Sequence, residues 1–590
     1  MSTDQEISGA EIILQALKDQ EVDTIFGYPG GAVLPIYDAL FGQNFLKHVL
    51  VRQEAGAVHA AEGYARSSGK VGVLLVTSGP GVTNVVTGLT DALMDSIPLV
   101  CISGQVPSHL IGTDAFQECD TTGITRPCTK HNYLVKDVSK LSEIIHEAFE
   151  IARSGRPGPV LIDIPKDVQF AKSNYVKKSE VTFKSHRIKS GSKDINREFI
   201  ETLVDHIKKS KKPIFYVGGG CLNSGPLASQ ELMKLVELTN IPITTTLHGL
   251  GCYPGEDSKS LGMLGMHGTY EANLAMNQCD LMINVGARFD DRVTGRLDAF
   301  SPDSIKFHFD IDQSSINKNV KVDYHTNTDI TLSLKAINEY ITSNSIQFDL
   351  NQYSEWWNSI EEWRGKDCLH YEQSDDTIKP QHAITRLYEL TNTKDTFITT
   401  EVGQHQMWAA QYYKFDKPNR WLTSGGLGTM GFGMPAAIGA QMANPDALVV
   451  DIAGEASFLM NIQEIATAVQ YKLPIKIFIL NNEYMGMVRQ WQELLHGSRY
   501  SESYVDALPD FKKLAESFNA VGVRAKNLSE LDDAINEMIS VDRPVIADIW
   551  VDKKENCFPM IPSGAAHNEM LLSKYDKEKP ENQEKGKVLV

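Results

Sequence analysis

The feature that most constrains the fold is a strand, turn and helix pattern that recurs along the whole chain. Short apolar runs end in glycine-containing turns, and segments with helical periodicity follow them. This order is typical of parallel sheets that are covered by helices. The sequence therefore predicts an α/β fold made of doubly wound parallel sheets.

Two polar stretches, at about residues 172–194 and 342–379, divide this pattern into three blocks. The chain has 590 residues, and a domain usually has about 100 to 200. We therefore expect three domains, at residues 1–175, 195–345 and 375–555, followed by a C-terminal segment at 556–590. Its charged end, from Ser573, is expected to be disordered.

The first and third blocks share one internal order. In the first, a predicted strand at 71–76, a glycine turn and a predicted helix at 82–94 lead into a strand at 99–102. In the third, a strand at 448–452, a turn at Gly454 and a helix at 458–471 lead into a strand at 475–480. This likeness suggests a duplication, with a site where two such domains face each other. Chance similarity remains open, because the fold is common.

The composition excludes several classes of function. The chain has 57 basic and 75 acidic residues, a net charge of -18, which argues against nucleic-acid binding. Its eight cysteines include no Cys-x-x-Cys pair, which fits a reducing compartment. The N-terminus lacks a signal pattern, and no run of about 18 apolar residues occurs. We expect a cytoplasmic protein with no membrane or nucleic-acid partner.

Polar residues follow two neighbouring predicted strands of the third block. Gly454-Glu455-Ala456-Ser457 follows one strand, and Asn481-Asn482 ends the next. Parallel sheets bind ligands at this edge. The spacing resembles the metal motif of thiamine-diphosphate enzymes, which usually have aspartate where this chain has Glu455. The resemblance implies an all-oxygen Mg²⁺ site made by Glu455, the Asn482 side chain and the Tyr484 carbonyl. Alone, Glu455 could simply complement a helix dipole.

A second carboxylate lies in the first block, where Arg52-Gln53-Glu54 precedes a predicted helix. The context resembles that of the activating glutamate of thiamine-diphosphate enzymes, which hydrogen-bonds the cofactor's pyrimidine ring and promotes loss of the thiazolium C2 proton. Glu54 in isolation could also be a dipole-compensating residue. Because Glu54 and Glu455 lie on different blocks, the resemblance implies a dimer in which two subunits share each site. Met430 would then wedge between the two cofactor rings.

Within that superfamily, nearly the whole chain resembles the acetohydroxyacid synthases, with matching segments at 26–31, 112–118, 286–295, 402–408 and 486–491. The resemblance implies decarboxylation of pyruvate and transfer of the two-carbon unit to pyruvate or 2-ketobutyrate. It implies pyrimidine-binding, FAD-associated and diphosphate-binding domains in that order. It also implies a homodimer or homotetramer and a small regulatory subunit. A flavin-dependent pyruvate oxidase remains the main alternative, and a regulatory homologue a weaker one.

The resemblance assigns roles residue by residue. It places Glu54, Gln117, Lys166 and Gly31 at the reacting atoms, with the Gly31 amide facing an oxyanion. It places Phe116, Arg292, Met487 and Trp491 around the acceptor, with Arg292 on its carboxylate. Each of these could alone be a surface or core residue. The implied contacts of thiamine diphosphate are Tyr28, Pro29, Gly30, Glu54, Pro80, Asn84, Val402, Gly403, Gln404, His405, Gly428, Met430, Gly454, Ala456, Ser457, Gly486 and Met487.

The middle block has a glycine turn, Gly218-Gly219-Gly220, directly after a predicted strand. Such a turn lets a backbone approach a phosphate, although it is not a full dinucleotide motif. The resemblance implies that this block binds FAD without net redox chemistry. The implied contacts are Arg156, Gly218, Gly219, Gly220, His267, Gly286, Arg288, Asp310 and Asp312. The segment 557–567 is a candidate lid over the diphosphate.

Overall fold

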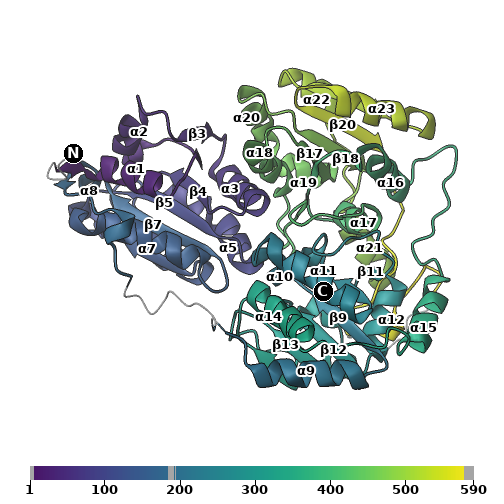
Figure 1. Cartoon of the computed structure of the whole chain (residues 1–590). Coiled ribbons are helices and arrows are strands. Elements are labelled where there is room, and N and C mark those ends of the chain that lie inside the picture. Colours follow the sequence, from purple (N-terminus) through teal and green to yellow (C-terminus); the bar gives the residue numbers. More distant parts are fainter. Residues whose placement is uncertain (1–5, 184–191, 193, 577–590) are drawn as a thin grey trace.

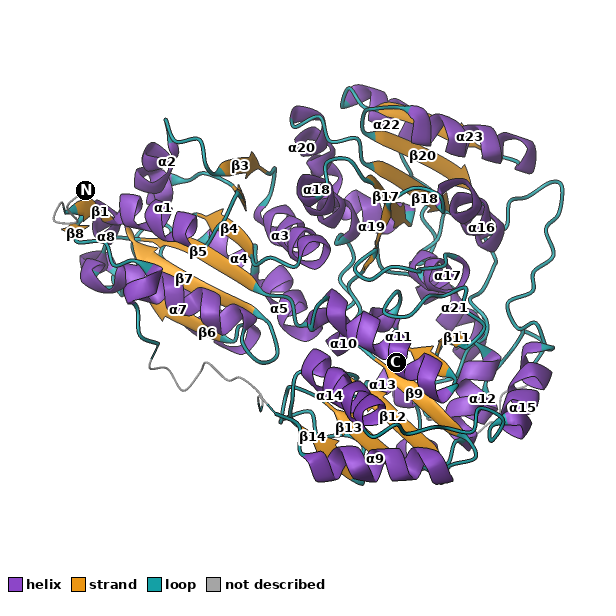
Figure 2. Ribbon diagram, viewed as in Figure 1, coloured by secondary structure: helices purple, strands orange, loops and turns teal. Residues whose placement is uncertain are grey.

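The structure is a computed structural model that describes residues 6–183, 192 and 194–576. Three α/β units follow one another along the chain, coloured purple to blue, teal, and green to yellow in Figure 1. Each has a six-stranded sheet, and every pairing within these sheets is parallel. Helices cover both faces of the sheets (Figure 2). The predicted fold class is therefore confirmed.

The N-terminal unit contains a sheet with the strand order β3-β2-β4-β5-β7-β6. Its strands are β2 (Thr24–Gly27), β3 (Lys47–Leu50), β4 (Gly72–Val76), β5 (Leu99–Gln105), β6 (His131–Leu134) and β7 (Pro159–Pro165), and β1 (Ile7–Ser8) pairs separately with β8 (Lys172–Ser173). Its helices are α1 (Gly9–Asp19), α2 (Leu34–Leu40), α3 (Glu54–Ser68), α4 (Pro80–Thr83), α5 (Val86–Asp95), α6 (Thr121–Thr125), α7 (Leu141–Arg153) and α8 (Lys166–Phe170).

The C-terminal unit has the order β16-β15-β17-β18-β20-β19. Its strands are β15 (Thr396–Thr400), β16 (Trp421–Leu422), β17 (Leu448–Ala453), β18 (Lys476–Asn481), β19 (Val521–Ala525) and β20 (Val545–Trp550). Its helices are α16 (Pro380–Thr391), α17 (Gln404–Tyr412), α18 (Gly433–Ala443), α19 (Glu455–Phe458), α20 (Ile465–Gln470), α21 (Gly486–Leu495), α22 (Phe511–Ser517) and α23 (Leu528–Ser540). Counted along the chain, its six strands have the same spatial order as those of the N-terminal unit, 2-1-3-4-6-5. This shared topology supports the duplication.

The middle unit has a different order, β11-β10-β9-β12-β13-β14. Its strands are β9 (Pro213–Val217), β10 (Ile243–Thr245), β11 (Ser260–Met263), β12 (Leu281–Val285), β13 (Ile305–Phe309) and β14 (Tyr324–Thr326). Its helices are α9 (Arg197–Lys209), α10 (Gly219–Asn223), α11 (Pro226–Thr239), α12 (Tyr270–Gln278), α13 (Asp291–Thr294), α14 (Ile330–Ser343) and α15 (Ser354–Arg364). Counted along the chain the order is 3-2-1-4-5-6, which is that of dinucleotide-binding folds, and their ligands lie where the order reverses.

Two predicted helices are interrupted. The predicted helix at 82–94 is split between α4 and α5, and Asn84 at the break donates to the Glu54 carboxylate. The predicted helix at 458–471 is kinked at Asn461, whose φ is -129°. The Asn461 side chain donates to the carbonyl of Gly431 at 2.6 Å. In both places a side-chain contact with a distant residue accompanies the departure from regular helix.

The segment predicted to divide the middle and C-terminal units carries helix α15. Trp356 and Tyr353 are buried in the core of the middle unit. The Trp356 indole donates to the carbonyl of Pro213 at 3.1 Å. The core of the middle unit therefore continues beyond residue 345, because an aromatic helix lies within the polar stretch.

The segment 557–567 lies against the middle unit, and much of it is buried. The Ile561 amide donates to the carbonyl of Met266 at 2.7 Å, and a ring nitrogen of His567 lies 2.6 Å from the carbonyl of Val293. These bonds fix the segment as a strap between two units, so its movement as a lid stays a hypothesis. Residues 577–590 of the predicted charged tail lie outside the described residues.

Helices α3 and α18 hold the N-terminal and C-terminal units together, and one hydrophobic core runs through both units. The two helices lie side by side in Figure 1.

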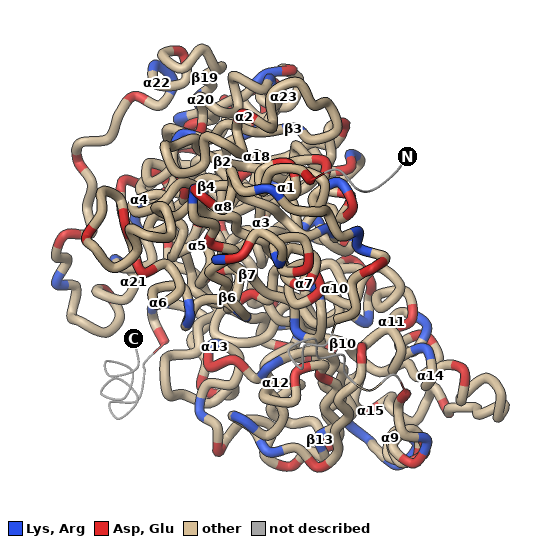
Figure 3. The backbone as a smooth tube through the Cα atoms, turned by 90° about the vertical axis from the view of Figure 1, so that its left-hand side faces the viewer, with Lys and Arg blue, Asp and Glu red and all other residues tan. Residues whose placement is uncertain are grey.

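Acidic and basic residues are interspersed along the tube in Figure 3, which shows no continuous basic stripe on the described elements in that view. Among the described residues, no helix combines the length and apolar character needed to cross a membrane.

Candidate active site

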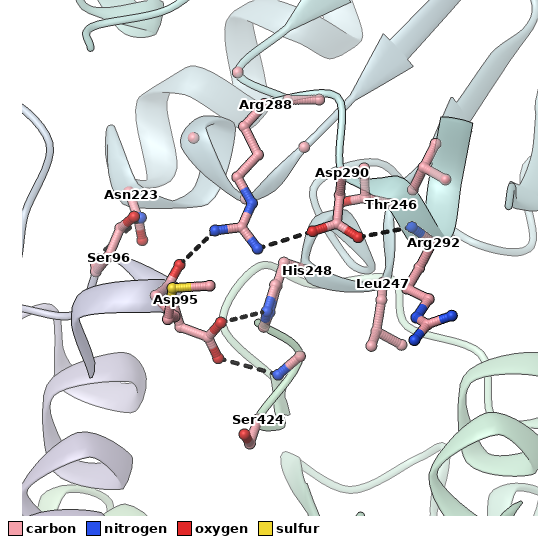
Figure 4. A pocket seen from close by; sticks show the side chains of 18 of the residues that line it. Asp95, Ser96, Asn223, Thr246, Leu247, His248, Arg288, Asp290, Arg292 and Ser424 are labelled. Atoms are coloured by element: carbon pink, nitrogen blue, oxygen red, sulfur yellow. Dashed lines mark hydrogen bonds and ion pairs between the residues drawn. The ribbon is translucent and has the colours of Figure 1, made fainter. Parts of the chain in front are cut away.

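A cavity of about 640 Å³ lies between the middle and C-terminal units. The carboxyl ends of parallel strands from both sheets border it, and the end of α5 from the N-terminal unit reaches it. Figure 4 shows Asp95, the last residue of α5, and Ser96 after it facing residues of the other two units there. Three units therefore contribute to one cavity.

The middle unit supplies the glycine-rich wall. Gly218 follows β9 and Gly286 follows β12, at the point where the strand order reverses. A side chain on Gly286 would place its Cβ 2.8 Å from the Cα of Gly220, and Gly286 has a φ of +68°. The two turns can therefore approach each other closely only because Gly220 and Gly286 have no side chains.

Most of the predicted FAD contacts come together in this cavity. Arg156, Gly218, Gly219, Gly220, His267, Gly286, Arg288 and Asp310 line it. Asp312 does not, but its carboxylate lies 3.6 Å from the Arg156 guanidinium. The buried Tyr216 hydroxyl and His267 Nε2 have no hydrogen-bond partner among the described residues. The wall thus offers glycines, cations and unpaired polar groups to a ligand.

The predicted substrate contacts of the middle and C-terminal units lie in the same cavity. Met487 and Trp491 are four residues apart on α21, and both line it with Met430. Arg292 joins them from α13, and its guanidinium is 3.9 Å from its nearest carboxylate, that of Asp291. Figure 4 draws no hydrogen bond or ion pair from the Arg292 head group to the other side chains shown. It is therefore available to an anion.

The predicted metal ligands Glu455, Asn482 and Tyr484 follow the ends of the neighbouring strands β17 and β18. Glu455 begins α19, and its carboxyl group faces the backbone of Asn482 and Tyr484. The Asn482 side-chain oxygen accepts from the Tyr484 amide at 3.0 Å. Burial raises the pKa of Glu455 to about 8, and its Oε1 has no partner among the described residues. The longer glutamate side chain thus still reaches the strand ends that carry its predicted co-ligands.

Around this group lie the other predicted diphosphate contacts. Val402, Gly403 and Gly428 line the cavity, whereas Gln404 and His405 are buried beside it. A Cβ on Gly486 would lie 2.1 Å from Gln404 Oε1, and one on Gly454 would lie 2.7 Å from His405 Nδ1. Burial lowers the pKa of His405 to about 3, so its ring is neutral. Ala456 and Ser457 continue α19 from Glu455.

The thiamine and substrate candidates of the N-terminal unit lie at the carboxyl edge of their own sheet, and unlike the predicted FAD contact Arg156 none of them lines the cavity. Glu54 is buried at the start of α3, where its carboxylate accepts from Asn84 Nδ2 at 2.9 Å. Phe116 is 89% exposed on the loop after β5. The others follow the ends of β2, β4, β5 and β7: Tyr28, Pro29, Gly30, Gly31, Pro80, Gln117 and Lys166. One chain therefore presents two partial sites.

Two residues that the sequence did not single out lie at the centre of the cavity wall. The Asp95 carboxylate accepts from Arg66 at 2.6 Å and from the Gly426 amide at 2.7 Å, and it pairs with His248 at 3.1 Å. Burial opposes ionisation, but His248 and Arg66 hold the pKa of Asp95 well below its usual value. Nothing in the local sequence distinguishes Asp95 from a surface residue at a helix end, so only its three-dimensional partners reveal it.

Comparison with known proteins matches the three units to one enzyme family. Residues 7–124 match the N-terminal TPP binding domain of thiamine pyrophosphate enzymes, 200–337 match the central domain and 401–549 match the C-terminal TPP binding domain. The chain is 47% identical over 577 residues to the acetolactate synthase isozyme 3 large subunit of Escherichia coli strain K12, covering 97% of this chain and 99% of that one. The chain belongs to the acetolactate synthase family.

The likeness to acetolactate synthases extends across bacteria and plants. The large subunit of Haemophilus influenzae is 45% identical over 578 residues, covering 97% of this chain and 100% of its own. The chloroplastic acetolactate synthase of Arabidopsis thaliana is 46% identical over 577 residues, which cover 96% of this chain and 85% of the plant protein. Membership of the thiamine-enzyme superfamily and of its acetolactate synthase branch, predicted from the sequence, is confirmed.

Proposed function

We propose that this chain is the catalytic subunit of an acetohydroxyacid synthase. It decarboxylates pyruvate and joins the two-carbon unit to pyruvate or to 2-ketobutyrate, with thiamine diphosphate, Mg²⁺ and FAD as cofactors. The observation that carries the proposal is the single cavity that unites Arg292, Met430 and Trp491 in a chain of this family. Arg292 supplies a cationic group, and Met430 and Trp491 supply an apolar wall. Together they fit the carboxylate and the side chain of a keto acid as the second substrate.

The residues behind the cavity fit thiamine diphosphate with a divalent cation. Glu455 Oε1, Gln404 Oε1 and His405 Nε2 are buried without partners among the described residues. Such groups are costly to bury unless something pairs with them. An all-oxygen set of Glu455, Asn482 and the Tyr484 carbonyl suits Mg²⁺. We assign these three residues to the metal and the glycine turns at 403, 428, 454 and 486 to the diphosphate.

The middle unit fits FAD. Its strand order is that of dinucleotide-binding folds, and the turns at Gly218 and Gly286 lie where the order reverses. Arg156 and Arg288 line the cavity and supply positive charge for a diphosphate. The unpaired Tyr216 hydroxyl supports the same assignment, because a flavin offers polar edges to such a group.

Bound thiamine diphosphate supplies the nucleophilic carbon and the electron sink for decarboxylation. Glu54 contributes the carboxyl group that exchanges a proton with the cofactor. Gln117, Lys166 and Phe116 orient the reacting keto acids, and the Gly31 amide stabilises negative charge on an oxygen. Arg292 binds the acceptor carboxylate, while Met487 and Trp491 contact its side chain and favour 2-ketobutyrate by about 1 to 3 kcal/mol.

The proposal includes a homodimer or homotetramer, with the homodimer as the smallest active assembly. Two partial sites in one chain support subunit sharing, because Glu54 and the metal ligands lie at the edges of different sheets. Two bacterial relatives are named large subunits, which supports a smaller regulatory partner. The eight cysteines are all unpaired, which supports the cytoplasmic location.

The test is acetolactate formation from pyruvate by the purified chain with thiamine diphosphate, Mg²⁺ and FAD. We expect product only when thiamine diphosphate and Mg²⁺ are present. The Glu54→Gln variant should lose roughly 100- to 10,000-fold in kcat, because its side chain cannot exchange the proton. Flavin reduction by pyruvate without acetolactate would instead support a pyruvate oxidase and contradict the proposal.

A further inference from the structure

A buried carboxylate beneath the candidate site has no role in the assignments made above. Glu401 follows β15 directly and is completely buried. Its Oε2 accepts from the Gly431 amide at 2.7 Å and from the Ser457 hydroxyl at 2.8 Å. Its Oε1 accepts from the Met434 amide at 3.1 Å. One side chain thus joins two segments that are far apart in the sequence.

Two of these bonds hold residues that are candidate cofactor contacts or lie next to one. Gly431 directly follows Met430, and Ser457 lies two residues after Glu455. Met434 lies in the first turn of α18, so the carboxylate also satisfies amide groups at that helix terminus. The positions of Met430 and Glu455 are therefore coupled through one side chain.

The turn that carries Met430 is fixed on its other sides as well. Asn461 donates to the Gly431 carbonyl at 2.6 Å, and the Ser424 hydroxyl accepts from the Thr429 amide at 2.8 Å. Gly431 has a φ of +89°, which glycine adopts readily and other residues rarely do. Glu401 is the carboxylate among these anchors, and charged hydrogen bonds are stronger than neutral ones.

The surroundings of Glu401 favour its acting as an acceptor. Asp451 on the neighbouring strand β17 is also fully buried. Burial raises the pKa of both carboxyl groups, but the bonds that Glu401 accepts from Ser457 and the backbone lower its pKa again, whereas the adjacent Glu401 raises that of Asp451 further. The hydrogen bonds therefore favour the charge of the pair on Glu401. A Cβ on Gly433 would lie 2.2 Å from the Asp451 carboxyl, so α18 packs directly on these two side chains.

We propose that Glu401 is a positioning residue: its hydrogen bonds hold Met430 and the turn at Glu455 in the relative positions that cofactor activation requires. This inference rests on the proposed function, since it assigns Met430 and Glu455 to thiamine diphosphate and its metal. Glu401 itself does not line the cavity and does not act on the substrate. Its effect should therefore be on the cofactor's reactivity and not on keto-acid affinity.

The experiment compares Glu401→Gln with the wild type, using thiamine diphosphate and Mg²⁺ as the probe. Glutamine has one acceptor oxygen and a donor group that would face an amide or the Ser457 hydroxyl. We expect exchange of the thiazolium C2 proton for deuterium, followed by rapid-quench NMR, to slow roughly 10- to 100-fold. The kcat for acetolactate should fall by a similar factor, while the KM for pyruvate changes little.

Two further variants separate positioning from general damage. Glu401→Asp keeps an ionised acceptor and should restore most of the exchange rate. Glu271→Gln changes another largely buried glutamate, in the distant helix α12, and should leave the exchange rate unchanged. A wild-type exchange rate in Glu401→Gln would overturn the inference. An inactive wild type that does not exchange the C2 proton would instead refute the proposed function.

If Glu401→Gln does not fold, Asn461→Ala decides the question. It releases the carbonyl of the same Gly431 and leaves the buried carboxyl pair intact. We expect a slower C2 exchange there too, of roughly tenfold. An unchanged rate in Asn461→Ala would show that the anchoring of this turn does not control activation, and the inference would be abandoned.

Discussion

Several histidines of this chain are buried where they cannot carry a charge. His267 lies in the cavity wall and is 4% exposed, with its Nδ1 at 3.1 Å from the carbonyl of Pro559. Burial lowers its pKa from 6.5 to about 4. The unfolded chain therefore binds a proton at this residue between these pH values, while the folded chain does not. Stability contributed by the neutral ring is lost as pH falls through this window.

The prediction at this scale concerns His267→Asn. Asparagine can still donate to the Pro559 carbonyl, but it does not titrate. Lowering the pH from 7 to 5 should destabilise the wild type relative to the variant by about 2 kcal/mol, as follows from the pKa difference. Chemical denaturation of the cofactor-free protein at both pH values measures this difference. The exposed residue His325 supplies the control substitution, His325→Asn. A difference that does not depend on pH would contradict the assignment of a neutral buried ring.

Single residues also show what sequence reasoning missed. Glu455 and Asn482 could be predicted, because each follows an apolar run and parallel strands end at one edge. Glu401 and Asp95 could not be predicted as positioning groups. Their partners at Gly431 and Gly426 lie 30 and 331 residues away, and no local spacing encodes such contacts.

At the scale of elements, the contact between α3 and α18 depends on residues without side chains. A Cβ on Gly439 would lie 1.8 Å from the carbonyl oxygen of Ala60, and one on Gly63 would lie 2.1 Å from that of Ala436. Both obstacles are backbone atoms, which no rotamer change can move. The helices therefore pack backbone to backbone. Because α3 begins at Glu54 and α18 follows Met430, this packing also locates both candidate residues.

We therefore predict that Gly439→Ala separates the two helices. The expected destabilisation is about 1 to 3 kcal/mol, the usual range for overpacking. Affinity for thiamine diphosphate, measured by titration calorimetry with Mg²⁺, should also fall. Gly255→Ala serves as the control, since its nearest neighbour would be an ordinary 3.4 Å away. Equal stability of the two variants would show that the helices can adjust at this contact.

The elements themselves were largely predictable. The apolar runs at 71–76 and 448–452 correspond to β4 and β17, because buried parallel strands need continuous apolar sequence. Helix interruptions at Asn84 and Asn461 were not predictable, since each asparagine bonds a residue from another element. Helix α15 was also missed, because a polar composition around its tryptophans resembles a linker.

At the scale of the whole molecule, the separation of Glu54 from the metal ligands leads to a test by mixing chains. In the proposed dimer each site takes Glu54 from one subunit and Glu455 from the other. A dimer of one Glu54→Gln chain and one Glu455→Ala chain would then have one intact site and one site with both defects. Equal amounts of the two chains, refolded together, should recover about a quarter of wild-type activity, since about half of the dimers are mixed.

The two inactive variants assayed separately provide the baseline for this experiment. Sites contained within one chain would give no recovery on mixing, because every chain would still carry a defect. Recovery that depends on co-refolding, and not on simple addition of folded dimers, would support exchange of subunits as the cause. Size-exclusion chromatography of each variant checks that both still assemble.

The carboxyl end of α5 contacts the other two units at once. The Asp95 carboxylate accepts from Gly426 of the C-terminal unit and pairs with His248 of the middle unit, and the Met94 carbonyl accepts from Arg288 (Figure 4). The three folds are separate in topology, but they are not interchangeable parts. A chimera that takes its middle unit from a relative would inherit new partners for this helix end. Exchange of units between such enzymes therefore has to preserve the three-way junction as well as the boundaries of each domain.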